Sequence, residues 1–204
     1  MDLDPDRALV RALSSDDATE RRRALSELYD RHQQRVYNTA YRVLGSAADA
    51  QDVSQEVFLH VADRIRSFRG DSSLTSWVYR VTVNMAIDAR RRAKRRAPSR
   101  SGARVGGDDS GDLEGAAPRP GLAEPEGNPE EAAERAETER KVHTALDRLS
   151  PKLRAVVVLR YFENLSYEDL ADVLQTSIGT VKSRLNRAHA ALEGILGPLA
   201  RGQG

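Results

Sequence analysis

Residues Leu165 to Leu192, "LSYEDLADVLQTSIGTVKSRLNRAHAAL", contain two short helical patterns separated by only a few residues. The first opens at Ser166 on the letters SYED, which resemble a capping box with aspartate in place of the usual glutamate. Ser177 is placed to cap the second pattern, which starts with small and basic residues. We therefore predict two short, tightly coupled helices in this stretch.

The second of these helices has two faces on a wheel of 3.6 residues per turn. The inward face carries Val181, Leu185, Ala188 and Leu192. The outward face carries Lys182, Ser183, Asn186 and Arg187, with Arg184 on its flank and Gly179 and Thr180 at the amino end. Such side chains donate hydrogen bonds to base edges and phosphates, and backbone amides at a helix start can hold a phosphate. The pattern predicts a helix-turn-helix whose second helix enters the major groove, with an ordinary solvated helix pair as the alternative.

The composition of the chain limits the classes of protein that it can be. The 204 residues include 39% hydrophobic residues, a formal net charge of +1 and no cysteine. Disulfide frameworks, thiolate zinc sites and cysteine nucleophiles are therefore excluded. The acidic start "MDLDPDRALV" is unlike a signal peptide, and no stretch approaches the roughly 20 apolar residues that span a bilayer. We expect a soluble cytoplasmic protein.

Helical periodicity also dominates the first half of the chain. Apolar residues recur at three- and four-residue spacing over 25–44, 46–68 and 74–96, and no strand alternation is present. The stretch that follows is rich in proline, glycine and acidic residues and too polar to bury a core. We therefore predict an all-α protein of two small helical domains joined by a long flexible acidic linker. The expected division is an N-terminal extension at 1–23, a helical bundle at 24–96, the linker at 97–138 and the helix-turn-helix domain at 139–199.

Two long stretches resemble a known family. "LSPKLRAVVVLRYFENLSYEDLADVLQTSIGTVKSRLNRAHAAL" is similar to the fourth region of bacterial RNA polymerase sigma subunits. "DAQDVSQEVFLHV" and "FRGDSSLTSWVYRVTVNMAIDARRR" are similar to their second region. The pairing and short length resemble the extracytoplasmic-function (ECF) group. This resemblance implies a subunit that binds core polymerase, recognises the minus-35 and minus-10 promoter elements, melts DNA and directs transcription initiation.

The resemblance also assigns roles within the second region. The residues implied in binding the clamp coiled coil of the largest polymerase subunit are Asp49, Asp52, Gln55 and Glu56. The loop implied in capturing a flipped base of the minus-10 element comprises Phe68, Arg69, Gly70, Asp71, Ser72 and Ser73. The next helix carries Arg80, Asn84, Asp88, Arg91 and Arg95 along one side, with Asn84 matching a position near the minus-10 bases. The basic run at 90–96 suits backbone phosphates, or is a solubilising tail.

In the fourth region, the resemblance implies that the last helix reads the minus-35 element. Lys182, Ser183, Asn186 and Arg187 are expected to read bases, and Thr180 and Arg184 to hold phosphates. Gln175 departs from the family pattern, because the turn usually has glycine there. The implied partners are core RNA polymerase, through its clamp and flap, promoter DNA and an anti-sigma factor. The acidic linker either mimics nucleic acid near the RNA exit path or is a solvated tether.

Two other functions fit parts of the sequence. A stand-alone helix-turn-helix regulator acting as a dimer explains residues 165–192 equally well, but it gives no reason for the stretch at 68–92. An enzyme is disfavoured, because His32, His60, His143 and His189 sit in separate helices without ligand spacing or a nucleophile motif. We expect no cofactor, no metal and no catalytic activity.

Overall fold

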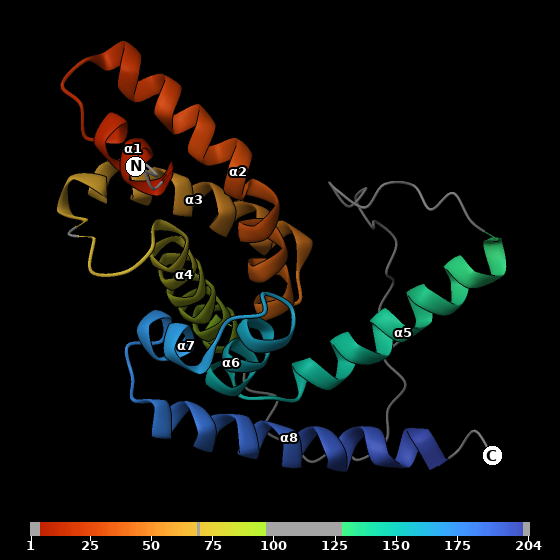
Figure 1. Ribbon diagram of the computed structural model, residues 1–204. Coiled ribbons are helices and arrows are strands. Elements are labelled where there is room, and N and C mark those ends of the chain that lie inside the picture. Colours follow the sequence, from red (N-terminus) through yellow and green to blue (C-terminus); the bar gives the residue numbers. More distant parts are fainter. Residues whose placement is uncertain (1–4, 69, 97–127, 202–204) are drawn as a thin grey trace.

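Helices form the whole regular structure of the described part of the chain. The computed structural model describes residues 5–68, 70–96 and 128–201. Two bundles are present (Figure 1). The N-terminal bundle contains α1 (Pro5–Leu13), α2 (Ala18–Leu44), α3 (Ala47–Arg64), the short 3-10 helix η1 (Ile65–Ser67) and α4 (Leu74–Arg96). The C-terminal bundle contains α5 (Pro129–Asp147), α6 (Pro151–Tyr161), α7 (Tyr167–Val173) and α8 (Ile178–Arg201). The all-α, two-domain prediction is confirmed.

In the N-terminal bundle, α2, α3 and α4 pack against one another. Gly45 ends α2 with φ of 84°, a left-handed conformation that glycine adopts without a steric penalty. Ser46 then caps α3 by accepting a hydrogen bond from the Asp49 backbone amide. Helix α2 starts earlier than its periodicity predicts, because the Asp17 side chain accepts a hydrogen bond from the Thr19 amide at 2.7 Å.

His32 is buried in α2, and its burial makes the stability of the fold depend on pH. Burial is the main cause that lowers the pKa of His32 below 6.5; Asp6 opposes this shift, and Arg35 and Arg31 add to it. The unfolded chain therefore takes up a proton at this site before the folded chain does. We expect the free energy of unfolding to fall as the pH is lowered through about 6.5.

Urea unfolding at pH 7 and at pH 5 measures this dependence. In His32→Gln, the difference between the free energies of unfolding at pH 7 and at pH 5 should be smaller than in the wild type. His60→Gln, on α3, is the control and should keep the wild-type difference. Equal differences for both variants would contradict the assignment to His32.

The C-terminal bundle starts inside the segment that the sequence predicts as linker. Helix α5 begins at Pro129, ten residues before the predicted start at 139, whereas residues 97–127 of the expected linker lie outside the described part of the chain. The letters PEEAAERAETER explain the early start, because alanine, glutamate and arginine favour helix and proline suits the first turn.

Helix α6 is buried on every side over residues 154–159. A helix of this kind needs neighbours on opposite sides. Helix α8 covers one side, and α2 and α4 of the N-terminal bundle cover another. The two bundles therefore share one hydrophobic core in this structure.

A buried carboxylate joins the two bundles at the end of α6. Glu163 accepts hydrogen bonds from the hydroxyls of Thr39 at 2.9 Å and Tyr79 at 2.5 Å. Burial raises the pKa of Tyr79, and the hydrogen bond to Glu163 raises it further. Next to this site, the Arg42 guanidinium lies 4.4 Å from the centroid of the Phe162 ring. The contact between the two bundles at this site thus combines a charged carboxylate, hydrogen bonds and an aromatic ring.

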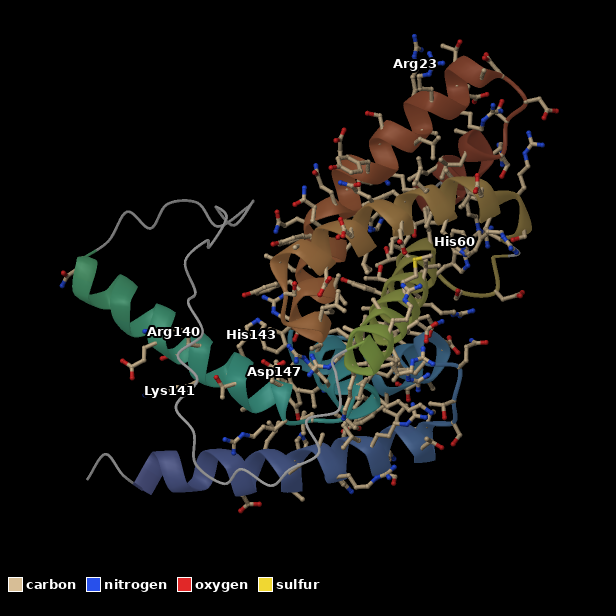
Figure 2. The ribbon with its side chains drawn as sticks, turned by 180° about the vertical axis from the view of Figure 1, so that it is seen from behind. Arg23, His60, Arg140, Lys141, His143 and Asp147 are labelled. Atoms are coloured by element: carbon tan, nitrogen blue, oxygen red, sulfur yellow. The ribbon has the colours of Figure 1, made fainter. Side chains whose placement is uncertain are left out.

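A second polar cluster lies where α5 meets α2, α4 and α6. Figure 2 labels Asp147 at the C-terminal end of α5. Its carboxylate pairs with Arg90 at 3.2 Å and with the fully buried Arg154. Arg90 also donates to the carbonyls of Val43 and Leu44, and Arg154 donates to the carbonyl of Arg42. These carbonyls end α2, so both guanidinium groups lie at the negative end of its dipole.

Candidate nucleic-acid interface

Helices α7 and α8 form the two-helix unit that the sequence predicts. The capping box at the start of α7 is present, with Ser166 and Asp169 exchanging hydrogen bonds. Ser177 caps α8 by accepting a hydrogen bond from the Thr180 amide at 3.2 Å. Gln175 occupies the turn with φ of 48°, so a non-glycine residue takes the left-handed conformation there. Its side-chain amide donates to the Asp172 carbonyl at 2.8 Å, which ties the turn to α7.

The capping box is expected to contribute measurably to the stability of this unit. Ser166→Ala removes the acceptor of the Asp169 amide, and losing such a cap costs about 1 kcal/mol. Urea unfolding of the variant should show this loss. Ser26→Ala, at an exposed position on α2, is the control and should change the free energy by no more than about 0.5 kcal/mol. A loss no larger than that of the control would show that the cap contributes nothing.

Helix α8 turns its donor-rich face away from the core. Val181, Leu185 and Ala188 are buried, as the wheel predicts. Lys182, Ser183, Asn186 and Arg187 are exposed, whereas Arg184 and Thr180 are half-buried. This exposure leaves the four outward side chains accessible to base edges in a groove.

Two contacts orient basic side chains on this face. The Lys182 ammonium lies 5.9 Å from the centroid of the Tyr167 ring, and Arg187 donates from Nε to the Ser183 carbonyl at 3.3 Å. Thr180 shares a hydrogen bond of 3.0 Å with the Ser177 hydroxyl at the start of the helix. The residues expected at the minus-35 element therefore gather on one helix and its cap.

The residues expected at the minus-10 element lie on α4 and on the loop before it. In the loop, Gly70 has φ of 76° and Ser73 accepts a hydrogen bond from the Ser76 amide at 3.0 Å, which caps α4. Phe68 packs against Trp77, with ring centroids 5.4 Å apart. Gly70, Asp71 and Ser73 are exposed and Ser72 is half-buried. Arg69, the remaining loop residue, lies outside the described part of the chain.

On α4, the structure exposes Asn84, Asp88 and Arg91 on the expected side. Asp88 and Arg91 form an ion pair at 3.7 Å. Arg80 is half-buried, and its Nε has no hydrogen-bond partner among the described residues.

Trp77 on α4 could serve either as a stacking residue for a base or as a core residue. It is partly buried and packs against the core, which favours the core interpretation.

The residues expected to bind the polymerase clamp form a stripe on the exposed side of α3, called the acidic stripe below. Asp49, Asp52, Gln55 and Glu56 are all exposed. One turn further along the helix, Leu59 is 68% exposed, which sequence periodicity alone did not single out. The stripe thus combines negative charge with one apolar side chain.

Other kinds of site are not seen in the described residues. No group of three or more histidine, cysteine, aspartate or glutamate side chains there is arranged to hold a metal ion. No helix of the described ranges is both long and apolar enough to cross a bilayer.

A helix-turn-helix with a donor-rich outer face, in a chain that also carries a basic helix, defines a DNA-binding protein. Comparison with known proteins identifies the family. Residues 28–96 match the family described as sigma-70 region 2, and residues 139–192 match sigma-70, region 4. The chain belongs to the sigma-70 family of RNA polymerase sigma factors, in its ECF group. It is a promoter-recognition subunit that binds core RNA polymerase, and its family is one of transcription initiation factors.

Curated relatives cover most of the chain. It is 36% identical over 183 residues to the RNA polymerase sigma-H factor of Pseudomonas aeruginosa, a match that covers 88% of this chain and 90% of the relative. It is 32% identical over 199 residues to the ECF RNA polymerase sigma-E factor of Escherichia coli, with 96% of each chain covered.

Solved structures share the fold. CnrH, in complex with the cytosolic domain of CnrY, aligns with a TM-score of 0.65 and 24% identity over 96% of this chain and 99% of that one. The sigma factor RpoE of Bartonella quintana, in complex with the anti-sigma factor NepR, aligns with a TM-score of 0.58 and 20% identity over 84% of this chain and 96% of that one.

Proposed function

We propose that this sigma factor reads the minus-35 element with α8 and melts the minus-10 element with α4 and the loop before it. The observation that carries this proposal is the exposed donor face of α8. Lys182, Ser183, Asn186 and Arg187 contact bases in the major groove, whereas Thr180 and Arg184 hold phosphates.

The minus-10 element is contacted by the N-terminal bundle. The loop at 68–73 holds an extruded base, and Arg80, Asn84, Asp88 and Arg91 on α4 contact the separated strand next to it. Exposed basic residues continue along α4 from Arg91 to Arg95 and bind backbone phosphates, which makes the binding dependent on salt.

The acidic stripe on α3 binds the clamp of the largest polymerase subunit. Its exposed carboxylates suit a basic partner helix and steer its approach. The C-terminal bundle binds the flap of the polymerase. The chain acts in the cytoplasm and has no catalytic activity of its own.

The domain boundaries follow from the same roles. Residues 24–96 bind the polymerase and the minus-10 element, 139–199 bind the minus-35 element, 97–138 connect them and 1–23 precede them. An anti-sigma factor binds the protein and holds it inactive. The similar structure of RpoE, solved with the anti-sigma factor NepR, supports such a partner.

Run-off transcription with sigma-free core polymerase and a pool of genomic promoter fragments tests the function. Discrete transcripts that appear only with the chain present would support it, and their upstream sequences would supply both promoter elements. No transcripts, together with a two-fold symmetric footprint from the chain alone, would favour a stand-alone regulator instead.

Reversing one charge of the acidic stripe tests the clamp contact. Asp52→Lys should lower the rate of association with core polymerase roughly 10-fold at low salt, with a smaller difference at high salt. Asp30→Lys reverses an exposed charge on α2 and is the matched control. Stopped-flow binding measures both rates, and equal rates for the two variants would rule out the stripe as the polymerase contact.

A further inference from the structure

A cavity of about 640 Å³ lies between α1 and the loop that precedes α4. Helix α1 lines it with Val10, Arg11 and Ser14, and the loop lines it with Phe68, Asp71 and Ser72. The match to sigma-70 region 2 begins only at residue 28, so α1 lies outside it. One wall of this cavity is therefore a part of the chain to which the family match assigns no role.

Helix α1 is a fixed part of the fold. Leu9 is 3% exposed and Leu13 is 0% exposed, so both side chains anchor the helix in the core. Just after the helix, Asp16 forms an ion pair with Arg66 of η1 at 2.8 Å. Helix α1 is thereby fixed against α2 and η1, next to the start of the loop.

The size of the cavity suits a nucleotide, because pockets for small ligands measure roughly 300–1,000 Å³. Its lining has the chemistry that an extruded nucleotide needs. Phe68 offers an aromatic ring, Ser72 and Asp71 offer polar groups for the edge of a base, and Val10 offers apolar contact. Arg11 is exposed on the α1 wall and offers a guanidinium group to a backbone phosphate.

We propose that α1 forms the second wall of the pocket that holds a nucleotide extruded from the minus-10 strand. Arg11 binds the backbone phosphate of that nucleotide, and Val10 contacts its base opposite Phe68. This inference rests on the proposed function of the loop, and it adds the residues that close the pocket from the other side.

Binding of the single-stranded minus-10 oligonucleotide to the holoenzyme tests the role of Arg11. The oligonucleotide is taken from a promoter found in the run-off assay. Arg11→Ala should weaken binding roughly 10-fold and reduce the slope of log affinity against log salt by about 0.7, the value for one phosphate contact on a single strand. Arg22→Ala removes another exposed arginine, on α2, that does not line the cavity, and is the matched control.

Filling the cavity tests the place of the base. Making each position of the strand abasic in turn identifies the extruded position as the one where the loss of the base weakens binding most. The wild-type holoenzyme should therefore bind the intact strand more tightly than the strand that is abasic at that position. Val10→Trp should remove this preference, because the indole occupies the space of the base. A Val10→Trp holoenzyme that keeps the wild-type preference would place the base elsewhere.

The outcomes separate this inference from the proposed function. A wild-type holoenzyme that neither opens a promoter nor binds the strand would overturn both. A wild-type holoenzyme that does both, with Arg11→Ala and Arg22→Ala equal in affinity and salt slope, would overturn only the role of α1.

Discussion

Replacing Arg154 by alanine is expected to lower the free energy of unfolding of the full chain by about 2–5 kcal/mol, the range for truncating a large buried side chain. Arg154 is 0% exposed and donates to the Asp147 carboxylate and to the Arg42 carbonyl. The substitution removes one donor from the half-exposed Asp147 carboxylate, which keeps its pair with Arg90, and one donor from the last turn of α2. It also opens a cavity under α6. The expected cost is large because the lost packing and the lost hydrogen bonds both belong to one fully buried side chain.

Urea unfolding followed by circular dichroism measures this loss. Arg154→Met keeps most of the side-chain volume, so its difference from Arg154→Ala separates packing from hydrogen bonding. Arg148→Ala removes an exposed arginine from the same part of the chain and should change the free energy by no more than about 0.5 kcal/mol. Equal losses for Arg154→Ala and Arg148→Ala would show that the buried guanidinium does not hold the bundles together.

Sequence periodicity predicts the faces of single helices well. It places Val53, Val57 and Val61 in the core and Lys182 and Arg187 outside it, as the structure does. The reason is that a helix face depends on residues three and four apart, which the sequence displays directly. Helix α1 was missed, although the spacing of Leu9 and Leu13 could have indicated it.

Contacts between the bundles could not be predicted in this way. Thr39 and Tyr79 reach Glu163 across 124 and 84 residues of sequence, and no local pattern links them. The apolar run at 155–159 does indicate a helix buried all round, but it does not say what covers it. For the same reason the sequence indicated the loop at 68–73 as a binding element but not α1, which lines the other side of the cavity.

Replacing Arg187 by alanine is expected to weaken binding of the holoenzyme to a duplex minus-35 element by roughly 10- to 100-fold, the range for losing one good base contact. Arg187 is exposed on the outward face of α8, so its removal should leave the fold intact. A base contact carries sequence information. Arg187→Ala should therefore also relax the preference for one base pair, which a set of single-position promoter variants would identify.

Arg184 provides the contrast that makes this result specific. It lies half-buried on the flank of the same face, where a phosphate contact is expected. Arg184→Ala should weaken all promoter variants about equally and reduce the salt slope by about 0.9, the value for one phosphate of a duplex. Lys152→Ala, exposed on α6, should change neither quantity. If Arg187→Ala instead weakened binding to every promoter variant equally, Arg187 would contact the DNA backbone. The base contacts would then be made by Lys182, Ser183 and Asn186.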